Sequence, residues 1–363
     1  MTALLSVGGN TYSKTDGPAD ELFFGSVDGV VQFRREGDRW QEVHRALQGL
    51  HVSSLAVEPR SGTMFAGTHN GSVHASADHG QTWEKRSSGV EQEEVYSLAV
   101  VDANGETRVY AGTEPAHLYV STDLGKTWTD LPAVRNVSGI GEWTFPAPPH
   151  EAHVKYITIQ PGQPDTLFAC VEQGALLRSH DAGKTFDIIY QASATDAHRI
   201  NVPPGRPDHL YLTRGDWSTG HEGIYLSKDD GASWERLFDR SLIGYPDATL
   251  IHPERPELIF VAGATGSPNA WGKMGQAGTH VARSRDGGRT WQTLGIPPAG
   301  VQGNIEAMTL NTWPGGAGIF AGTTDGDIYY SADEGESWTT ILSGLPAISK
   351  AGHWTWRRRL AAA

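Results

Sequence analysis

Acid–base and metal-ligating side chains recur at one place in the sequence, ahead of a position that is apolar in five of six copies. The repeated position holds Leu55, Leu98, Ile157, Ile200, Thr249 and Met308. Four residues earlier stand His51, Glu94, His153, Asp196, Tyr245 and Asn304, and two residues earlier stand Ser53, Tyr96, Lys155, His198, Asp247 and Glu306. Residues two apart on a strand share a face, so we expect two polar rings around a common axis.

These residue types suit several kinds of chemistry. Asp247 and Glu306 form one carboxylate pair for glycoside hydrolysis, with Glu94 as a further candidate, and such pairs lie ~5 or ~6.5–9.5 Å apart. His198 or Tyr96 could instead remove a proton, as in a polysaccharide lyase or an isomerase. The catalytic candidates are therefore His198, Asp247, Glu306 and Tyr96.

His51, His153 and Glu94 are candidate ligands for a divalent metal such as Zn, Mn or Fe, since imidazole and carboxylate suit these ions. No short H-x-H or H-E-x-x-H spacing supports the metal. The structural alternative is a wet channel whose polar groups satisfy one another through ordered water.

Three longer connecting segments, at 132–152, 214–222 and 264–279, carry four of the candidate substrate-binding residues, and Lys155 and Arg199 lie on predicted inner strands. Trp143, Trp217 and Trp271 could stack on a sugar ring or an aromatic ligand. Arg199, Arg214 and Lys155 could face an anionic group. Alternatively, the tryptophans pack as lids on the rim.

The elements that must position these residues are revealed by an internal repeat. The pattern Ser-x-Asp-x-Gly-x-Thr/Ser-Trp/Phe occurs six times, beginning at Ser76, Ser121, Ser179, Ser227, Ser284 and Ser331. A seventh, decayed copy keeps Gly37 and Trp40. Each repeat holds four short β-runs, for example at 52–57, 63–68, 71–76 and from 83, which predicts one four-stranded antiparallel blade per repeat.

The repeated aspartates are interpreted as structural. Asp accepts hydrogen bonds from its own turn, Gly supplies a positive φ, and the aromatic residue packs between blades. Loss of such an aspartate should therefore lower stability and leave the chemistry of the channel largely intact.

The pattern resembles the Asp-box, or bacterial neuraminidase (BNR), repeat of sialidases, xyloglucanases, sortilin-type receptors and photosystem II assembly propellers, over residues from about 20 to 343. The resemblance implies an all-β fold, a seven-bladed β-propeller of four-stranded antiparallel blades with Asp-box turns. We expect a single domain over 1–363, closed by pairing of 2–7 with a C-terminal strand, with the tail from about 344 in ring closure or partly disordered. In such a fold the first strands line the channel, and the long loops open on the face opposite the motifs.

Sialidases of this family use three arginines, a Tyr–Glu pair and an acidic residue, but the R-I-P signature is missing here and residues 33–36 do not replace it. Sialidase activity is therefore not expected. The sequence favours a small-molecule or saccharide ligand at the channel mouth, with hydrolase- or lyase-like chemistry that a metal could assist. The alternative is a non-catalytic protein-binding or assembly scaffold, because propellers host many functions.

Composition narrows the partners and the compartment. The 363 residues carry a net charge of −13, which disfavours nucleic acid and anionic membranes as partners. A single cysteine, Cys170, and an N-terminus without the features of a signal peptide favour a cytoplasmic protein. The sequence leaves the oligomeric state open.

Overall fold

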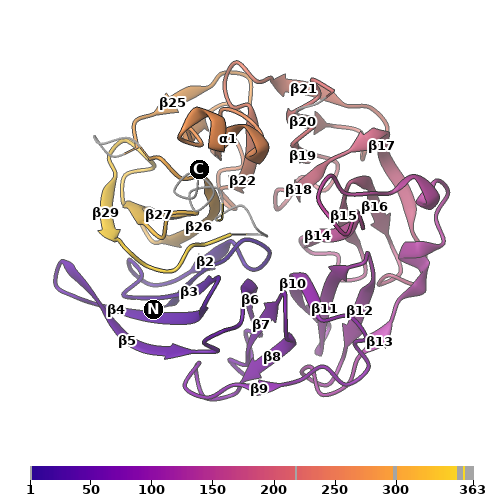
Figure 1. Cartoon of the computed structure of the whole chain (residues 1–363), viewed down its shortest axis with the longest axis horizontal. Coiled ribbons are helices and arrows are strands. Elements are labelled where there is room, and N and C mark those ends of the chain that lie inside the picture. The colour runs from indigo at the N-terminus through magenta and orange to yellow at the C-terminus, as the bar shows by residue number, and fades with distance from the viewer. Residues whose placement is uncertain (1, 217–218, 297–300, 350–354, 356–363) are drawn as a thin grey trace.

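Seven small sheets are arranged in a ring around a central axis in the computed structural model of the chain (Figure 1). The structure describes residues 2–216, 219–296, 301–349 and 355. Six sheets have four strands and the seventh has five. The predicted seven-bladed, all-β propeller is confirmed.

Within each blade the strands lie side by side in chain order, and the first of them is nearest the axis; blade 7 has one additional strand from the N-terminal segment. Blade 1 contains β1 (Thr2–Leu5), β3 (Glu21–Ser26), β4 (Gly29–Glu36) and β5 (Arg39–Ala46). Blade 2 contains β6 (Val52–Val57), β7 (Met64–Thr68), β8 (Ser72–Ser76) and β9 (Glu84–Lys85), and blade 3 contains β10 (Glu94–Ala103), β11 (Glu106–Glu114), β12 (Leu118–Ser121) and β13 (Thr129–Asp130). Blade 4 contains β14 (His153–Ile159), β15 (Leu167–Glu172), β16 (Gly174–Ser179) and β17 (Asp187–Thr195).

The remaining blades keep the same order. Blade 5 contains β18 (Ala197–Asn201), β19 (Leu210–Arg214), β20 (Gly223–Ser227) and β21 (Glu235–Phe238). Blade 6 contains β22 (Tyr245–Ile251), β23 (Ile259–Ala264), β24 (His280–Ser284) and β25 (Gln292–Leu294). Blade 7 contains β26 (Ile305–Trp313), β27 (Gly316–Thr323), β28 (Ile328–Ser331), β29 (Thr339–Leu342) and the added strand β2 (Tyr12–Lys14).

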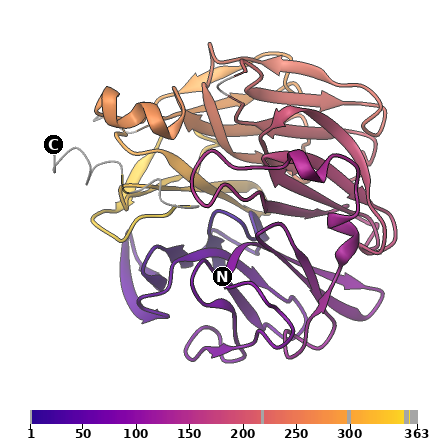
Figure 2. The ribbon, with the colours of Figure 1, turned by 45° about the vertical axis from the view of Figure 1, so that its right-hand side comes forward.

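The helices of the described part of the chain occur in connections between strands (Figure 2). The helix α1 (Pro268–Met274) lies in blade 6, and two 3-10 turns, η1 (Pro132–Arg135) and η2 (Ile140–Glu142), lie between blades 3 and 4. In the described part of the chain, no helix combines the length and the hydropathy that crossing a bilayer requires.

Ring closure differs from the predicted pairing of 2–7 with a C-terminal strand, which is wrong. β1 pairs in parallel with β3 of its own blade, from Thr2 opposite Glu21 to Leu5 opposite Phe24. The next strand, β2, pairs in parallel with β26, with Tyr12 opposite Leu310. The N-terminus therefore supplies the inner strand of blade 1 and then crosses to the inner side of blade 7.

The Asp-box turns repeat the same hydrogen bonds among their serine, aspartate and glycine, and the turn of blade 6 is an example. Ser284 Oγ accepts from Gly288 N at 2.8 Å and donates to Asp286 Oδ1 at 2.8 Å. Asp286 Oδ1 accepts from Thr290 N at 2.9 Å, and Trp291 Nε1 donates to the carbonyl of Gly288 at 3.0 Å. The hydrogen bonds from Thr290 hold the pKa of Asp286 at about 2. The aspartate is thus occupied by its own turn, as the sequence predicts.

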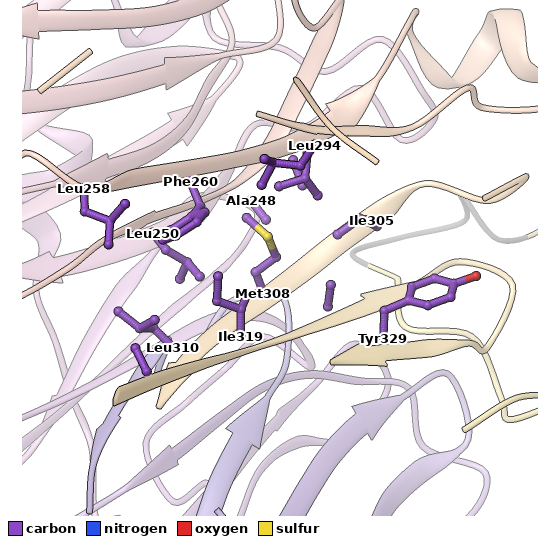
Figure 3. Close-up of a cluster of buried hydrophobic side chains, with 14 of the residues drawn as sticks. Ala248, Leu250, Leu258, Phe260, Leu294, Ile305, Met308, Leu310, Ile319 and Tyr329 are labelled. Carbon is purple, nitrogen blue, oxygen red and sulfur yellow. The ribbon is translucent and has the colours of Figure 1, made fainter. Parts of the chain in front are cut away.

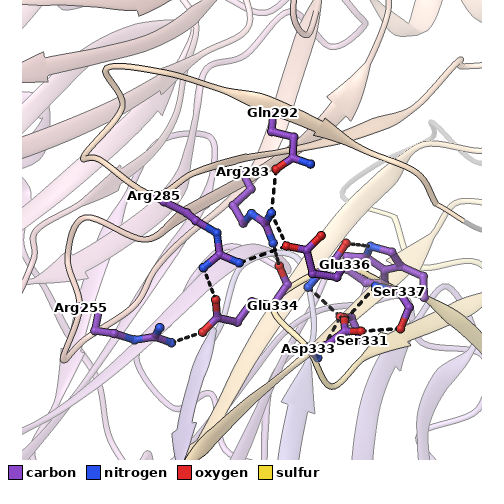
Figure 4. A network of polar contacts seen from close by, with 11 residues as sticks. Arg255, Arg283, Arg285, Gln292, Ser331, Asp333, Glu334, Glu336 and Ser337 are labelled. Atoms are coloured by element: carbon purple, nitrogen blue, oxygen red, sulfur yellow. Dashed lines mark hydrogen bonds and ion pairs between the residues drawn. The ribbon is translucent and has the colours of Figure 1, made fainter.

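Apolar cores lie between neighbouring blades. Figure 3 shows the core between blades 6 and 7, where Phe260, Leu294 and Met308 are fully or almost fully buried. At the Asp-box face the same two blades are joined by ion pairs, which Figure 4 shows. Arg283 lies 2.7 Å from Glu336 Oε1, and Glu334 pairs with both Arg255 and Arg285. The Asp-box turn of one blade thus docks on the outer strands of the previous one.

The central channel is filled on one side by residues 6–11, which we call the N-terminal plug. Gly8 N donates to the Ser53 carbonyl and Asn10 N to the Leu55 carbonyl, both at 2.9 Å. Tyr156 Oη donates to the Gly9 carbonyl at 3.1 Å. A Cβ on Gly9 would lie 1.9 Å from the Leu55 carbonyl oxygen, so only glycine fits there. The plug makes these contacts with blades 2 and 4.

Candidate functional site

The six residues of the second predicted ring come from blades 2 to 7. Each lies at the same backbone position of its inner strand, where the strand pairing is interrupted. The pairing of the first two strands skips one residue of the inner strand in each blade, and the skipped residues are Ser53, Tyr96, Lys155, His198, Asp247 and Glu306. Such β-bulges leave a residue outside the ladder and redirect its side chain, and they are common next to active sites. The six residues are thus structurally equivalent at the channel face of their blades.

Bulge residues and their neighbours from blades 4, 5 and 6 form one buried polar group, Lys155, Glu172, Asp196, His198 and Asp247, which we call the blade 4–6 cluster. Lys155 Nζ lies 2.7 Å from Glu172 Oε2 and 3.9 Å from Asp247 Oδ1. His198 Nε2 lies 3.1 Å from Asp196 Oδ1 and 3.5 Å from Glu172 Oε1. Each of the five residues is at most 6% exposed. The cluster therefore brings together Lys155, His198 and Asp247 from the predicted set.

Blades 2 to 4 contribute a row of rings beside this cluster. His51 and His69 have ring centroids 4.4 Å apart, His69 and Tyr96 4.3 Å apart, and Tyr96 stacks on His153 at 3.8 Å. Burial, followed by the nearby His69, lowers the pKa of His51 to about 4. Two rings thus stand between His51 and His153.

The predicted metal set of His51, His153 and Glu94 is not brought to one point, because the rings of His69 and Tyr96 separate the two histidines. His153 instead places its nitrogens 3.1 Å from Glu114 Oε2 and 3.2 Å from Glu172 Oε2. Burial alone would lower the pKa of His153, but these two carboxylates raise it above its ordinary value. His153 is therefore held by carboxylates from the second strands of blades 3 and 4.

Two glutamates of blade 3 lie at the open edge of this row. Glu94, the first residue of β10, is directly opposite Glu114, the last residue of β11. The Glu94 side chain is 46% exposed, whereas that of Glu114 is 11% exposed. Tyr96 Oη donates to Glu114 Oε2 at 2.9 Å. Burial and the charge of Glu114 raise the pKa of Glu94 to about 7.

The pKa of Glu114 is shifted downward, in the opposite direction to that of Glu94. Burial would raise the pKa of Glu114, but contacts with His153 and the hydrogen bond from Tyr96 lower it below its ordinary value. The partner tyrosine has a pKa well above its ordinary value, because it is buried and beside this carboxylate. Near neutral pH Glu94 therefore exchanges between its protonated and ionised forms, whereas Glu114 is ionised.

The two remaining catalytic candidates, Asp247 and Glu306, are the bulge residues of the neighbouring blades 6 and 7. Asp247 accepts a hydrogen bond from Asn304 Nδ2 at 2.6 Å and lies 3.4 Å from His198 Nδ1. Glu306 is 1% exposed and acts on the pKa of His51. The structure therefore couples Asp247 to the blade 4–6 cluster and Glu306 to the row of rings.

The predicted arginine ligands are used inside the fold. Arg199 is 2% exposed, lies 4.0 Å over the Tyr156 ring and donates to the Val7 carbonyl of the N-terminal plug at 2.6 Å. Arg214 is 1% exposed and its Nε donates to Asp216 at 2.7 Å. Their guanidinium groups are consequently engaged by the protein and do not face an open cleft.

The tryptophans of the long loops act as packing residues. Trp271 is fully buried, and its Nε1 donates to the Gly266 carbonyl at 2.7 Å. Trp143 is half-buried and packs on the core of blade 4, where a Cβ on Gly174 would lie 3.0 Å from its ring. The lid interpretation describes both residues better than ligand stacking does. Trp217 lies outside the described residues.

The sequence reasoning missed Glu114, Glu172 and His69. Glu114 and Glu172 end their second strands directly opposite Glu94 and His153, and His69 directly follows the second strand of blade 2. The signal that could have found them is the cross-strand register, because a residue opposite a predicted site residue shares its face of the blade.

Two clefts occur away from the channel mouth, among the Asp-box turns. One, of about 560 Å³, is lined by Glu58, Arg60 and Lys126 between blades 2 and 3. The other, of about 280 Å³, is lined by Arg206, Lys228 and Arg289 between blades 5 and 6. Neither contains a predicted site residue.

Comparison with known proteins agrees with this architecture. Residues 34–142 match the family described as photosynthesis system II assembly factor YCF48. No curated protein sequence matches the chain.

Among solved structures, the GH74 xyloglucanase from Xanthomonas campestris superposes with a TM-score of 0.66 and 17% identity, covering 93% of this chain and 56% of the enzyme. The chain thus spans about half the length of that enzyme. YCF48 bound to D1 peptide gives a TM-score of 0.51 at 17% identity, with 77% of each chain covered. Sqt1 from Saccharomyces cerevisiae superposes with a TM-score of 0.54 and 9% identity, and the match covers 95% of this chain and 89% of Sqt1.

At these identities the likeness to solved structures is one of fold. The repeat pattern and the hydrogen bonds of its turns are more specific, since all six copies build the same turn. The chain is therefore a β-propeller with Asp-box, or BNR-type, repeats.

Proposed function

We propose that the chain binds a small molecule or saccharide at the mouth of its channel, opposite the Asp-boxes, and acts on it by hydrolase- or lyase-like acid–base chemistry. The observation that carries the proposal is the Glu94–Glu114 pair. Two neighbouring carboxyl groups whose surroundings drive their pKa values apart are a common arrangement for an acid and a base.

The roles follow from protonation and exposure. Glu94, with a pKa of about 7 and a half-exposed side chain, can donate a proton to a ligand at neutral pH. Glu114 is ionised and is oriented by Tyr96 and His153, so it can accept a proton or stabilise developing positive charge. The fold can accommodate such chemistry, since the similar propeller of Xanthomonas campestris is a xyloglucanase.

The test is a panel of neutral and anionic polysaccharides that includes xyloglucan. Reducing-end release reports hydrolysis, and ultraviolet absorbance of unsaturated products reports elimination. We expect E94Q and E114Q to lower turnover by roughly 100-fold or more, the scale of a lost general acid or base, while calorimetric ligand affinity changes little. The control is E235Q, which changes a side chain that is 68% exposed in the outer strand of blade 5.

Unchanged turnover in folded E94Q and E114Q would contradict the proposal. Binding of a small molecule would be detected as a shift in the melting temperature of the wild-type chain when that molecule is added. The E94Q variant should alter this shift and the E235Q control should not. If neither product nor shift is found, the mouth is not a catalytic or small-molecule site.

A non-catalytic scaffold is the second candidate, favoured by the deep burial of the blade 4–6 cluster. Lys155, Glu172 and His198 are at most 6% exposed, so few polar groups of the mouth meet solvent directly. YCF48, whose family matches residues 34–142, has been solved with a D1 peptide. Peptide binding that E94Q leaves unchanged, in a chain without turnover, would favour this second function.

A further inference from the structure

The blade 4–6 cluster contains an excess of buried negative charge around one histidine. Glu172, Asp196 and Asp247 all lie within 3.5 Å of His198, whereas Lys155 is the fixed cation of the cluster. Buried carboxylates are stable only when they are paired or coordinate a metal. His153 also lies 3.2 Å from Glu172, but it is shared with Glu114, so carboxylates still outnumber the cations beside them. A divalent cation would remove this excess of negative charge.

The geometry at His198 is that of a metal ligand. Its Nδ1 lies 2.7 Å from the Pro246 carbonyl oxygen, and because a carbonyl can only accept, Nδ1 carries a proton. In the neutral ring the lone pair is then on Nε2, which points toward Asp196 and Glu172. A backbone carbonyl that fixes the tautomer in this way is the usual support of a metal-binding histidine.

The spacing of the three donor atoms fits one ion. Nitrogen and oxygen ligands lie about 2.0–2.2 Å from ions such as zinc, which places neighbouring donors about 3.0–3.5 Å apart. His198 Nε2 lies 3.1 Å from Asp196 Oδ1 and 3.5 Å from Glu172 Oε1. All three donors lie within 4.8 Å of one another, and no other such group occurs in the described part of the chain.

Asp196 supplies an independent observation. It is 4% exposed, and its Oδ1 receives no hydrogen bond although it faces His198. Gly215 keeps the adjacent space open, since a Cβ there would lie 2.4 Å from His198 Nε2 and 2.8 Å from Asp196 Oδ2. A buried carboxylate oxygen without a donor, beside a position that has no side chain, is expected where a cation binds.

We propose that Glu172, Asp196 and His198 bind one divalent transition-metal ion, Mn²⁺ or Zn²⁺, at the junction of blades 4 and 5. The mixed imidazole and carboxylate donor set suits these ions. The site differs from the His51, His153 and Glu94 set that the sequence suggests. It does not depend on chemistry at Glu94 and Glu114.

The experiment uses the full chain, stripped with chelator and titrated with MnCl₂ or ZnCl₂ by calorimetry, with bound metal counted by mass spectrometry. We expect one ion per chain. D196N and G215A should weaken binding about 100-fold or more, because the first removes a ligand and the second fills the adjacent space. The matched control is D208N, which changes an exposed Asp beside His209 on the Asp-box face.

Absence of stoichiometric binding of either metal, or wild-type affinity in folded D196N, would overturn the inference. If D196N does not fold, crystals of the wild-type chain soaked with either metal decide the matter. An anomalous difference peak between Glu172, Asp196 and His198 supports the site, and a peak elsewhere or none overturns it. Loss of turnover in E94Q without metal binding would leave the proposed function standing and remove only this inference.

Discussion

Glu94 and Glu114 are direct partners across the first two strands of blade 3, yet the pKa of one is raised and the pKa of the other is lowered. Burial, and then the charge of Glu114, raise the pKa of Glu94, whereas contacts with His153 and Tyr96 stabilise the charge of Glu114 and lower its pKa. An arrangement of blades 3 and 4 therefore sets the protonation of a residue at the rim.

The first prediction concerns this coupling. In E114Q the pKa of Glu94 should fall from about 7 but stay above its ordinary value, because burial is the larger cause and remains. Carbon-13 NMR titration of the glutamate side chains measures the change, with E235Q as the control. An unaltered Glu94 pKa in E114Q would show that the repulsion is not what raises it.

The second prediction concerns stability against pH. The folded pKa of Glu94 is about 7 against 4.5 for an ordinary glutamate, so folding favours its protonated form. Glu94 therefore costs stability as the pH rises from about 4.5 through 7, and E94Q abolishes this cost. Because the side chain is 46% exposed and screened by water, we expect E94Q to gain only about 1 kcal/mol over the wild type between pH 4.5 and pH 8.

Urea unfolding at a series of pH values measures this difference. A constant gap between E94Q and the wild-type chain over the whole range would contradict the raised pKa. A gap that closes toward high pH would reverse the assigned sign.

The third prediction concerns the Asp-box of blade 6. Ser284→Ala removes the acceptor of the buried Gly288 N–H and should lower the free energy of unfolding by about 1–3 kcal/mol. D208N, which changes an exposed residue on the same face, should differ from the wild type by no more than about 0.5 kcal/mol. Thermal unfolding compares the two variants. Equal stability of S284A and the wild type would show that the turn does not need its serine.

The fourth prediction concerns the N-terminal plug. Gly9→Ala would place a methyl group 1.9 Å from the Leu55 carbonyl oxygen, so the plug must shift and we expect a loss of at least about 2 kcal/mol. The matched control is Gly272→Ala in α1, where a Cβ meets nothing within 4 Å and helix propensity favours alanine by up to about 1 kcal/mol. Denaturant midpoints of both variants test the pair. A G9A variant as stable as G272A would mean that the plug does not fit tightly.

Much of the fold can be predicted from the sequence because each Asp-box marks where one turn lies and which two strands it joins. A serine, an aspartate and a glycine at set offsets build one turn, and the alternating runs around it become strands, as at 52–57. Alignment on Leu55 and its equivalents also finds the bulge residues, since the inner strands of blades 2 to 7 break their pairing at the same offset.

The rest of the site depends on relations between segments. The roles of Glu114 and Glu172 depend on register, which is set by the length of each hairpin and by the bulge itself. Trp271 and Arg199 look like ligand-binding residues in sequence, yet tertiary packing buries both. The plug, Ser-Val-Gly-Gly-Asn-Thr, has no periodicity that would predict its path through the channel.

The pairing of β2 with β26 has a consequence for how the protein is made. Tyr12 pairs with a residue about 300 positions away, so β2 cannot take its place in the ring until β26 has been synthesised. Contacts of such long sequence separation slow folding. The early blades can form one after another as they are synthesised, but the ring closes only when β26 of the last blade pairs with β2.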